Sequence, residues 1–146
     1  MSCRRIKKMY SKKRKIGDIG EGIACRFLEN KGYKIIEKNW WKPWGEIDIV
    51  AEKGGKTFFI EVKTVSFDDL PVGLMENDKR FNSYIDNLSI KPEDNIHPMK
   101  LKKLLRTIET YVLNKNYKGH FELHIALVYL DLRNKKTKVK IIEDVV

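Results

Sequence analysis

A pair of glycines, Gly54-Gly55, separates two short runs rich in apolar residues, at 46–52 and 57–63. Glycine reaches the positive φ angles that both central positions of a two-residue hairpin turn require, so the pattern predicts two antiparallel strands. The turn also fixes the register, because each facing pair lies one residue further out on both strands than the pair before it. This hairpin therefore determines which side chains at the centre of the chain face one another.

Two carboxylates face each other in this register. Asp48 lies opposite Glu61, and Glu46 lies opposite Lys63. Facing carboxylates, with Cβ atoms about 4.5–5.5 Å apart, repel each other and lower stability. A shared divalent cation would neutralise them, and ligands that are all oxygen atoms favour Mg²⁺ or Mn²⁺ over zinc. The pair Asp48 and Glu61 is therefore a candidate metal site.

Lys63 follows Glu61 by two residues and lies on the same face of its strand. Its ammonium group is then within reach of an anion bound by the metal. Such a site suits phosphodiester hydrolysis, in which the metal activates a water molecule and Lys63 orients that water or stabilises the transition state. Two alternatives stay open: a plain ion pair between Glu46 and Lys63, and a register slip of one residue.

The other face of the hairpin carries apolar residues and is expected to belong to the core. Its members are Ile47, Ile49, Ala51, Phe58, Ile60 and Val62. The remaining predicted elements are helices at 17–31 and 98–114 and strands at 33–39, 121–130 and 138–142. The order αβββαββ predicts an α/β fold with a mixed β-sheet flanked by helices. In it, the third strand, the second helix and the fourth strand form a right-handed parallel crossover.

The length of 146 residues favours a single domain, expected over residues 16–146. Residues 65–96 form a long polar insertion, with a short helix predicted at 76–88, that is either functional or mobile. Gly32 stands where a glycine ends the first helix. Glu21 lies at the edge of that helix, either as an ordinary exposed acid or, if the helix packs beside the hairpin, close to the same metal.

The net charge of +10 favours a polyanionic partner, most simply nucleic acid, with an anionic membrane surface second. Residues 1–15 hold eight bases and no acids, which predicts either a disordered, solvated arm or a phosphate-binding one. No apolar run approaches the ~20 residues that span a bilayer, so no membrane is expected. The two cysteines, Cys3 and Cys25, are too few for a disulfide framework, and a cytoplasmic location is expected.

Several bases are candidates for nucleic-acid binding. They are Lys12, Lys13, Arg14 and Lys15 in the arm and Lys100, Lys103 and Arg106 on the second helix. The bases on the second helix could instead only solvate its surface. Trp40, Trp41 and Trp44 could stack on bases or pack at a bend of the chain.

The sequence resembles the bacterial YraN family at a series of short motifs. In order they are Gly20-Glu21, Phe27-Leu28, Lys31-Gly32-Tyr33, Asn39-Trp40, Gly45-Glu46-Ile47-Asp48 and Glu61-Val62-Lys63-Thr64. The family is assigned to the restriction-endonuclease-like PD-(D/E)XK superfamily, which is related to Holliday junction resolvases. The sequence departs from the pattern at Trp41, where Arg is common.

The resemblance implies roles for particular residues. Asp48, Glu61 and Lys63 would be the metal-binding and catalytic triad, Glu21 an additional acidic ligand, and Lys100 a phosphate contact. It also implies subunits that often pair, which allows a homodimer. We therefore expect a Mg²⁺-dependent (or Mn²⁺-dependent) endonuclease-like protein acting on DNA, including branched DNA. The alternative is a non-catalytic nucleic-acid-binding module with the same fold.

Overall fold

The computed structural model describes residues 12–67, 97–133 and 135–145. The elements are α2 (Lys12–Asn30), β1 (Lys34–Lys42), β2 (Gly45–Lys53), β3 (Lys56–Phe67), α4 (Pro98–Asn114), β4 (Phe121–Asp131) and β5 (Lys136–Ile142). This is the predicted order, and α4 has the predicted bounds. The predicted insertion at 65–96 starts too early, because β3 continues to Phe67; its remainder, with the helix predicted at 76–88, lies outside the described residues.

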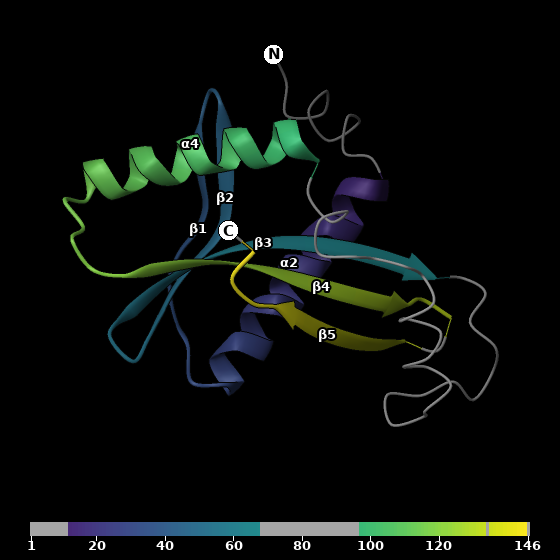
Figure 1. Cartoon of the computed structure of the whole chain (residues 1–146). Coiled ribbons are helices and arrows are strands. Elements are labelled where there is room, and N and C mark those ends of the chain that lie inside the picture. The colour runs from purple at the N-terminus through teal and green to yellow at the C-terminus, as the bar shows by residue number, and fades with distance from the viewer. Residues whose placement is uncertain (1–11, 68–96, 134, 146) are drawn as a thin grey trace, which may run out of the picture.

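The five strands form one mixed sheet in the order β1-β2-β3-β4-β5. β3 and β4 are parallel, and every other neighbouring pair is antiparallel. The two helices cover opposite faces: α2 crosses behind the sheet, while α4 lies in front of β1 and β2 (Figure 1). The mixed α/β class and the parallel connection through α4 are thus confirmed, and this is the architecture that the resemblance implied.

The β2–β3 hairpin has the predicted register. Gly54 and Gly55 have φ angles of 58° and 76°, and the ladder runs from Lys53↔Lys56 to Ile49↔Ile60. The positive φ values are those of a two-residue turn that matches the twist of the strands. The side chains of the hairpin therefore alternate between the α2 face and the α4 face over this stretch.

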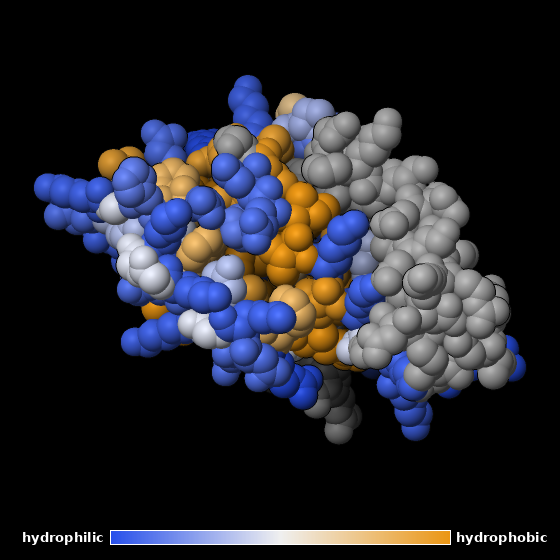
Figure 2. All heavy atoms as spheres, turned by 60° about the horizontal axis from the view of Figure 1, so that its bottom comes forward, coloured by the Kyte–Doolittle hydropathy of each residue, from blue (hydrophilic) through white to orange (hydrophobic). Residues whose placement is uncertain are grey.

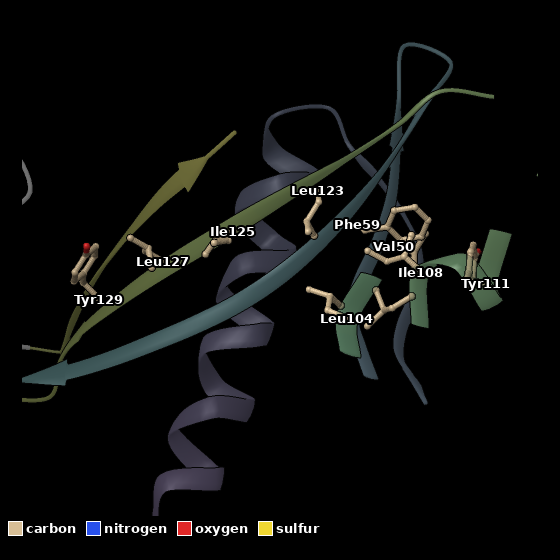
Figure 3. Packing of buried hydrophobic residues seen from close by; sticks show 10 residues of the cluster. Val50, Phe59, Leu104, Ile108, Tyr111, Leu123, Ile125, Leu127 and Tyr129 are labelled. Carbon is tan, nitrogen blue, oxygen red and sulfur yellow. The ribbon is translucent and has the colours of Figure 1, made fainter. Parts of the chain in front are cut away.

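Two hydrophobic clusters hold the layers together. Under α2 lie Ala24, Cys25, Leu28, Ile49, Ala51, Phe58, Ile60, Ala126, Val128 and Leu130. Under α4 and along β4 lie Ile47, Val50, Phe59, Leu104, Ile108, Tyr111, Leu123, Ile125, Leu127 and Tyr129, drawn as sticks in Figure 3. In the view of Figure 2, hydrophobic residues occupy the middle of the described surface and hydrophilic residues surround them.

The prediction for Ile47 is wrong in one respect. Ile47 is buried as expected, but it packs in the cluster under α4, whereas Ile49 packs under α2. Asn39 of β1 lies between the pairs Lys38↔Ile49 and Trp40↔Ile47 and has a φ of 52°. A left-handed residue interrupts the regular pleat, so strict alternation of faces ends opposite Asp48.

Helix α2 begins earlier than predicted, at Lys12, so residues 12–15 belong to the helix and not to an arm. Residues 1–11 of the predicted arm lie outside the described residues. The helix ends as predicted, because Gly32 has a φ of 92° and Tyr33 N–H donates to the carbonyl oxygen of Leu28 at 2.9 Å. In the described part of the chain, no helix is long and apolar enough to cross a membrane.

Gly45, the first residue of β2, allows α4 to lie close to the sheet. A Cβ atom on Gly45 would collide with Oγ1 of Thr107 and lie 3.3 Å from the carbonyl oxygen of Lys103. Thr107 is fully buried and its hydroxyl donates to that same carbonyl oxygen, so it has little room to move. The contact at Gly45 therefore sets the distance between β2 and the residues of α4 nearest to it.

We expect Gly45→Ala to lower the free energy of unfolding by about 1–3 kcal/mol, because the added methyl group overpacks this contact. Removing the Thr107 hydroxyl in the same chain, as Thr107→Ala, should recover part of the loss. Gly22→Ala is the matched control, since a Cβ there meets nothing within 4 Å, and it should raise stability by up to about 1 kcal/mol. Urea denaturation of the wild type and of these three variants measures their free energies of unfolding. Equal effects of Gly45→Ala and Gly22→Ala would contradict the close packing of Gly45 against α4.

Candidate functional site

The β2–β3 ladder ends where the two predicted acids begin. Beyond Ile49↔Ile60 the strands are no longer paired, and Oδ2 of Asp48 accepts a hydrogen bond from the backbone N–H of Val62 at 2.8 Å. The carboxylate of Asp48 thus lies against the backbone of β3, beside Glu61. The structure brings Asp48 and Glu61 together, as the register predicted.

Burial and the neighbouring Glu61 raise the pKa of Asp48 to about 8, although the Val62 N–H opposes the rise. Glu61 itself is buried, with 6% of its surface exposed. Two acids so close, one buried and one partly buried, favour one shared proton or a cation between them. Asp48 and Glu61 therefore form a coupled acidic pair at this end of the sheet.

Lys100 of α4 partly neutralises the pair. Its Nζ lies 2.6 Å from Oε1 of Glu61. Burial lowers the pKa of Lys100, but the hydrogen bond and charge of Glu61 outweigh this, and the pKa is raised overall. In this structure the partner of Lys100 is the buried acid Glu61, and its predicted phosphate contact stays a prediction.

A cavity of about 190 Å³ opens over the two acids. Its lining residues are Trp44, Gly45, Glu46, Asp48, Glu61, Lys100, Lys103 and Leu104. Helix α4 supplies the basic wall, because Lys100, Lys103 and Leu104 recur at helical spacing on the side that meets β2. The cavity therefore combines acids from two strands with bases from one helix.

Glu21 of α2 joins a neighbouring group. The amide nitrogen of Asn39, turned toward two carboxylates, donates to Oε2 of Glu21 at 3.0 Å and to Oε1 of Glu46 at 2.8 Å. Burial raises the pKa of both acids, and the Asn39 bond opposes the rise at Glu21. Glu21 reaches this end of the sheet because Gly20 places α2 directly against Thr64 of β3.

The comparisons with known proteins identify the family. The model of the uncharacterised protein family UPF0102 matches residues 20–130. The chain belongs to this family. A UPF0102 protein of Flavobacterium psychrophilum is 31% identical over 129 residues, covering 88% of this chain and 91% of the relative. One of Wolinella succinogenes is 33% identical over 99 residues, covering 68% and 71%.

Among solved structures, SfsA of Pyrococcus furiosus in complex with Ca²⁺ is similar at a TM-score of 0.30 and 15% identity, covering 84% of this chain and 61% of that one. A likeness this distant carries no functional inference. The UPF0102 match, in contrast, spans Glu21, Asp48, Glu61, Lys63 and Lys100. The YraN family, which is UPF0102, was the predicted family, so the resemblance is confirmed.

The donor set of this UPF0102 protein fits a divalent ion only in part. Among the described residues, no group of three or more His, Cys, Asp or Glu side chains is close enough to hold a metal ion. Asp48 and Glu61 are two oxygen ligands, which suffices for Mg²⁺ when the ion keeps several waters and also binds substrate phosphate. Glu21, which the resemblance implies as an additional ligand, bonds to Asn39 and lies near enough to Asp48 for its charge to add to the rise in the pKa of Asp48, after burial and Glu61.

Lys63 is half-buried and lies on the face of β3 opposite Thr64, which meets α2. It therefore shares the face of Glu61, as predicted. With the part of the chain that the structure describes, Lys63 forms no ion pair, so the predicted pair with Glu46 is absent there. Unlike the ammonium group of Lys100, that of Lys63 is not paired with an acid among the described residues.

The other predicted bases divide into two sets. Lys103 lines the cavity, and the guanidinium of Arg106 lies 4.7 Å from the ring centre of Trp44. Lys12, Lys13, Arg14 and Lys15 are exposed in the first turn of α2. Burial raises the pKa of Glu46 and the charge of Arg14 opposes that rise, which places the first turn of α2 near the acidic group.

Two contacts were missed by sequence reasoning. The ion pair of Lys100 with Glu61 depends on how α4 docks on the sheet. The position of Lys100 on a predicted helix did not indicate which residue of β3 it would meet. Asn39 bridges two acids from a left-handed backbone conformation. Asparagine tolerates that conformation better than most residues, but its presence in a predicted strand did not identify the bridge.

Proposed function

We propose that the chain is a metal-dependent endonuclease-like protein that hydrolyses phosphodiester bonds in DNA. The observation that carries the proposal is the pair of the partly buried Asp48 and the buried Glu61 in the lining of a cavity, with Lys63 on the same face of β3 as Glu61. Adjacent carboxylates with little exposure lower stability unless something neutralises them, and positions that cost stability are often functional. Membership of the UPF0102 family is in accord with the proposal.

Each residue has a distinct role in this proposal. Asp48 and Glu61 would hold a Mg²⁺ or Mn²⁺ ion, and the Val62 N–H fixes the carboxylate of Asp48. A bound divalent ion supplies a water of lowered pKa and offsets negative charge on the phosphoryl oxygens. The ammonium group of Lys63 stabilises charge that develops at the phosphate. Lys100 releases Glu61 or bonds to a phosphate oxygen when the substrate is bound.

The bases around the cavity support a polyanionic substrate. Lys103 and Arg106 lie on the α4 side, and residues 12–15 lie at the start of α2. Contacts of this kind are made to phosphates and are blind to sequence, so binding falls steeply with salt. We propose DNA as the substrate, with branched DNA included, and a homodimer as the assembly that would place two such sites on one junction.

The test is cleavage of end-labelled linear and four-way DNA with Mg²⁺, Mn²⁺, Ca²⁺ or EDTA. We expect cleavage with Mg²⁺ and Mn²⁺ and none with EDTA, because the acids alone do not activate water near neutral pH. Glu61→Gln is the variant control, since it keeps the size of the side chain and removes a ligand charge. Cleavage of equal rate in EDTA, or in Glu61→Gln, would refute the assignment.

One observation favours a second candidate, a nucleic-acid-binding module without catalysis. Lys100 already bonds to Glu61 at 2.6 Å, and the described residues supply no third acidic ligand. Such a protein would bind DNA with strong salt dependence and cleave it with none of the metals. The same assay, combined with a salt titration of binding, therefore separates the two candidates.

A further inference from the structure

Trp41 is an exposed aromatic residue at the end of β1, with 65% of its surface accessible. Its neighbour Trp40 is packed, with its ring centre 5.0 Å from that of Tyr111 in an edge-to-face arrangement. Of the two roles predicted for the tryptophans, stacking on bases or packing at a bend of the chain, Trp40 has the packing role and Trp41 does not. A tryptophan buries 150–250 Å² when it is covered, so leaving this one in water forgoes a large stabilisation.

The position of Trp41 joins it to the cavity. Trp41 pairs with Glu46 in the β1–β2 ladder, and Glu46 lines the cavity over Asp48 and Glu61. The turn that follows Trp41 carries Trp44, which also lines the cavity. The residue that faces Trp41 across the ladder therefore lines the proposed hydrolytic site.

Bases and acids both lie near Trp41. Lys42 follows it directly, with its Nζ 4.9 Å from the ring centre of Trp40, and Arg106 lies on the ring of Trp44. The acid Glu46 faces Trp41 across the ladder and bonds to the Asn39 amide. An exposed aromatic ring can stack on an unpaired base while bases nearby contact the phosphates of the same strand.

We infer that Trp41 is the stacking site for an unpaired base of the DNA substrate, next to the bond to be cut. This inference rests on the proposed function and adds to it a substrate class: DNA with unpaired nucleotides, as in single strands, flaps and branch points. Stacking needs the face of a base, which a continuous duplex does not offer along its length. A second copy of the chain is the less favoured occupant, because two surfaces with these bases would repel each other.

The test is equilibrium binding in EDTA, so that no cleavage occurs, with a labelled single-stranded oligonucleotide and the matching duplex as probes. We expect Trp41→Ala to weaken single-strand binding about 5- to 100-fold, which corresponds to the loss of one stacked base. Duplex binding should change less than about twofold. Trp41→Phe should keep most of the affinity, and quenching of tryptophan fluorescence by the oligonucleotide should be largely lost in it.

Phe121→Ala is the matched control, because Phe121 is also a partly exposed aromatic but pairs with Thr57 at the opposite end of the strands. It should leave both affinities unchanged. Equal losses for single strand and duplex, no loss at all, or a change of oligomeric state in Trp41→Ala by light scattering would each overturn the inference. If the wild type binds with this preference but cleaves nothing, the stacking site stands and the hydrolytic proposal fails.

Discussion

Asp48→Asn is expected to lower the cleavage rate by at least about 10²-fold, and yet to be harder to unfold than the wild type at pH 8. The loss of rate follows from removing one of the two charged ligands. The gain in stability follows from removing a charge that the fold holds at a cost, since the pKa of Asp48 is about 8 in the folded protein against 3.8 for an unperturbed aspartate. A variant that is inactive because it is misfolded would be less stable.

The sign of the pH effect follows from proton counts. Between pH 3.8 and about 8 the folded protein keeps a proton on Asp48 that the unfolded chain has released, so stability falls as pH rises through this window. An asparagine does not titrate, so its advantage should grow from little at pH 4 to about 2 kcal/mol or more at pH 8. Urea denaturation of both proteins at several pH values measures the difference.

Asp48→Ala is the control for the hydrogen bond of Asp48 to Val62. Asparagine keeps an acceptor oxygen for that N–H, whereas alanine leaves it unpaired in a partly buried position, at a cost of about 1–3 kcal/mol. We therefore expect Asp48→Ala to be less stable than Asp48→Asn at every pH. If Asp48→Asn is less stable than the wild type at pH 8, the carboxylate is a structural group and the metal assignment loses its main support.

The divalent ion should reverse the pH trend. A cation favours the ionised form of Asp48, so Mg²⁺ is expected to raise the melting temperature of the wild type more at pH 8 than at pH 6. It should leave Asp48→Asn nearly unchanged. This measurement does not depend on cleavage and so tests the metal site by itself.

The part of the site that lies within one hairpin could be predicted from the sequence. Two glycines determine the turn, and the turn determines that Asp48 and Glu61 come together and that Lys63 shares the face of Glu61. These relations depend only on local backbone geometry with a period of two. They hold even though the ladder itself ends one pair before the acids.

The contacts between layers could not be predicted in the same way. Lys100 meets Glu61, and Gly45 meets Thr107, because of the angle and depth at which α4 docks on β2. Glu21 was expected either as an exposed acid or close to the metal, and its bond to Asn39 was not predicted. The positive φ of Asn39 also shifts the alternation of faces at Ile47. Periodicity specifies which face a residue takes within an element but not how two elements meet.

Replacing Lys63 or Lys100 by alanine is expected to change different properties: the cleavage rate for Lys63 and the Mg²⁺ affinity for Lys100. Lys63→Ala should slow cleavage by about 10²–10³-fold, because it removes a positive group that acts on the developing charge. It should leave the Mg²⁺-induced rise in melting temperature unchanged, since Lys63 forms no ion pair with either acid in the described part of the chain. In this variant the cleavage rate would therefore fall while the affinity for Mg²⁺ stays the same.

Lys100→Ala removes the cation that lies 2.6 Å from Glu61. Because that ammonium group competes with a divalent ion for the same carboxylate oxygen, its removal should tighten Mg²⁺ binding, by about tenfold for a charge-assisted hydrogen bond worth at least ~1.5 kcal/mol. Without Mg²⁺ the variant should be less stable, since Glu61 is left buried without its partner. Thermal shift and calorimetric titration with Mg²⁺ measure both effects. If Mg²⁺ binds Lys100→Ala no better than the wild type, Lys100 is not a competitor of the metal, and its pairing with Glu61 is the arrangement of the non-catalytic alternative.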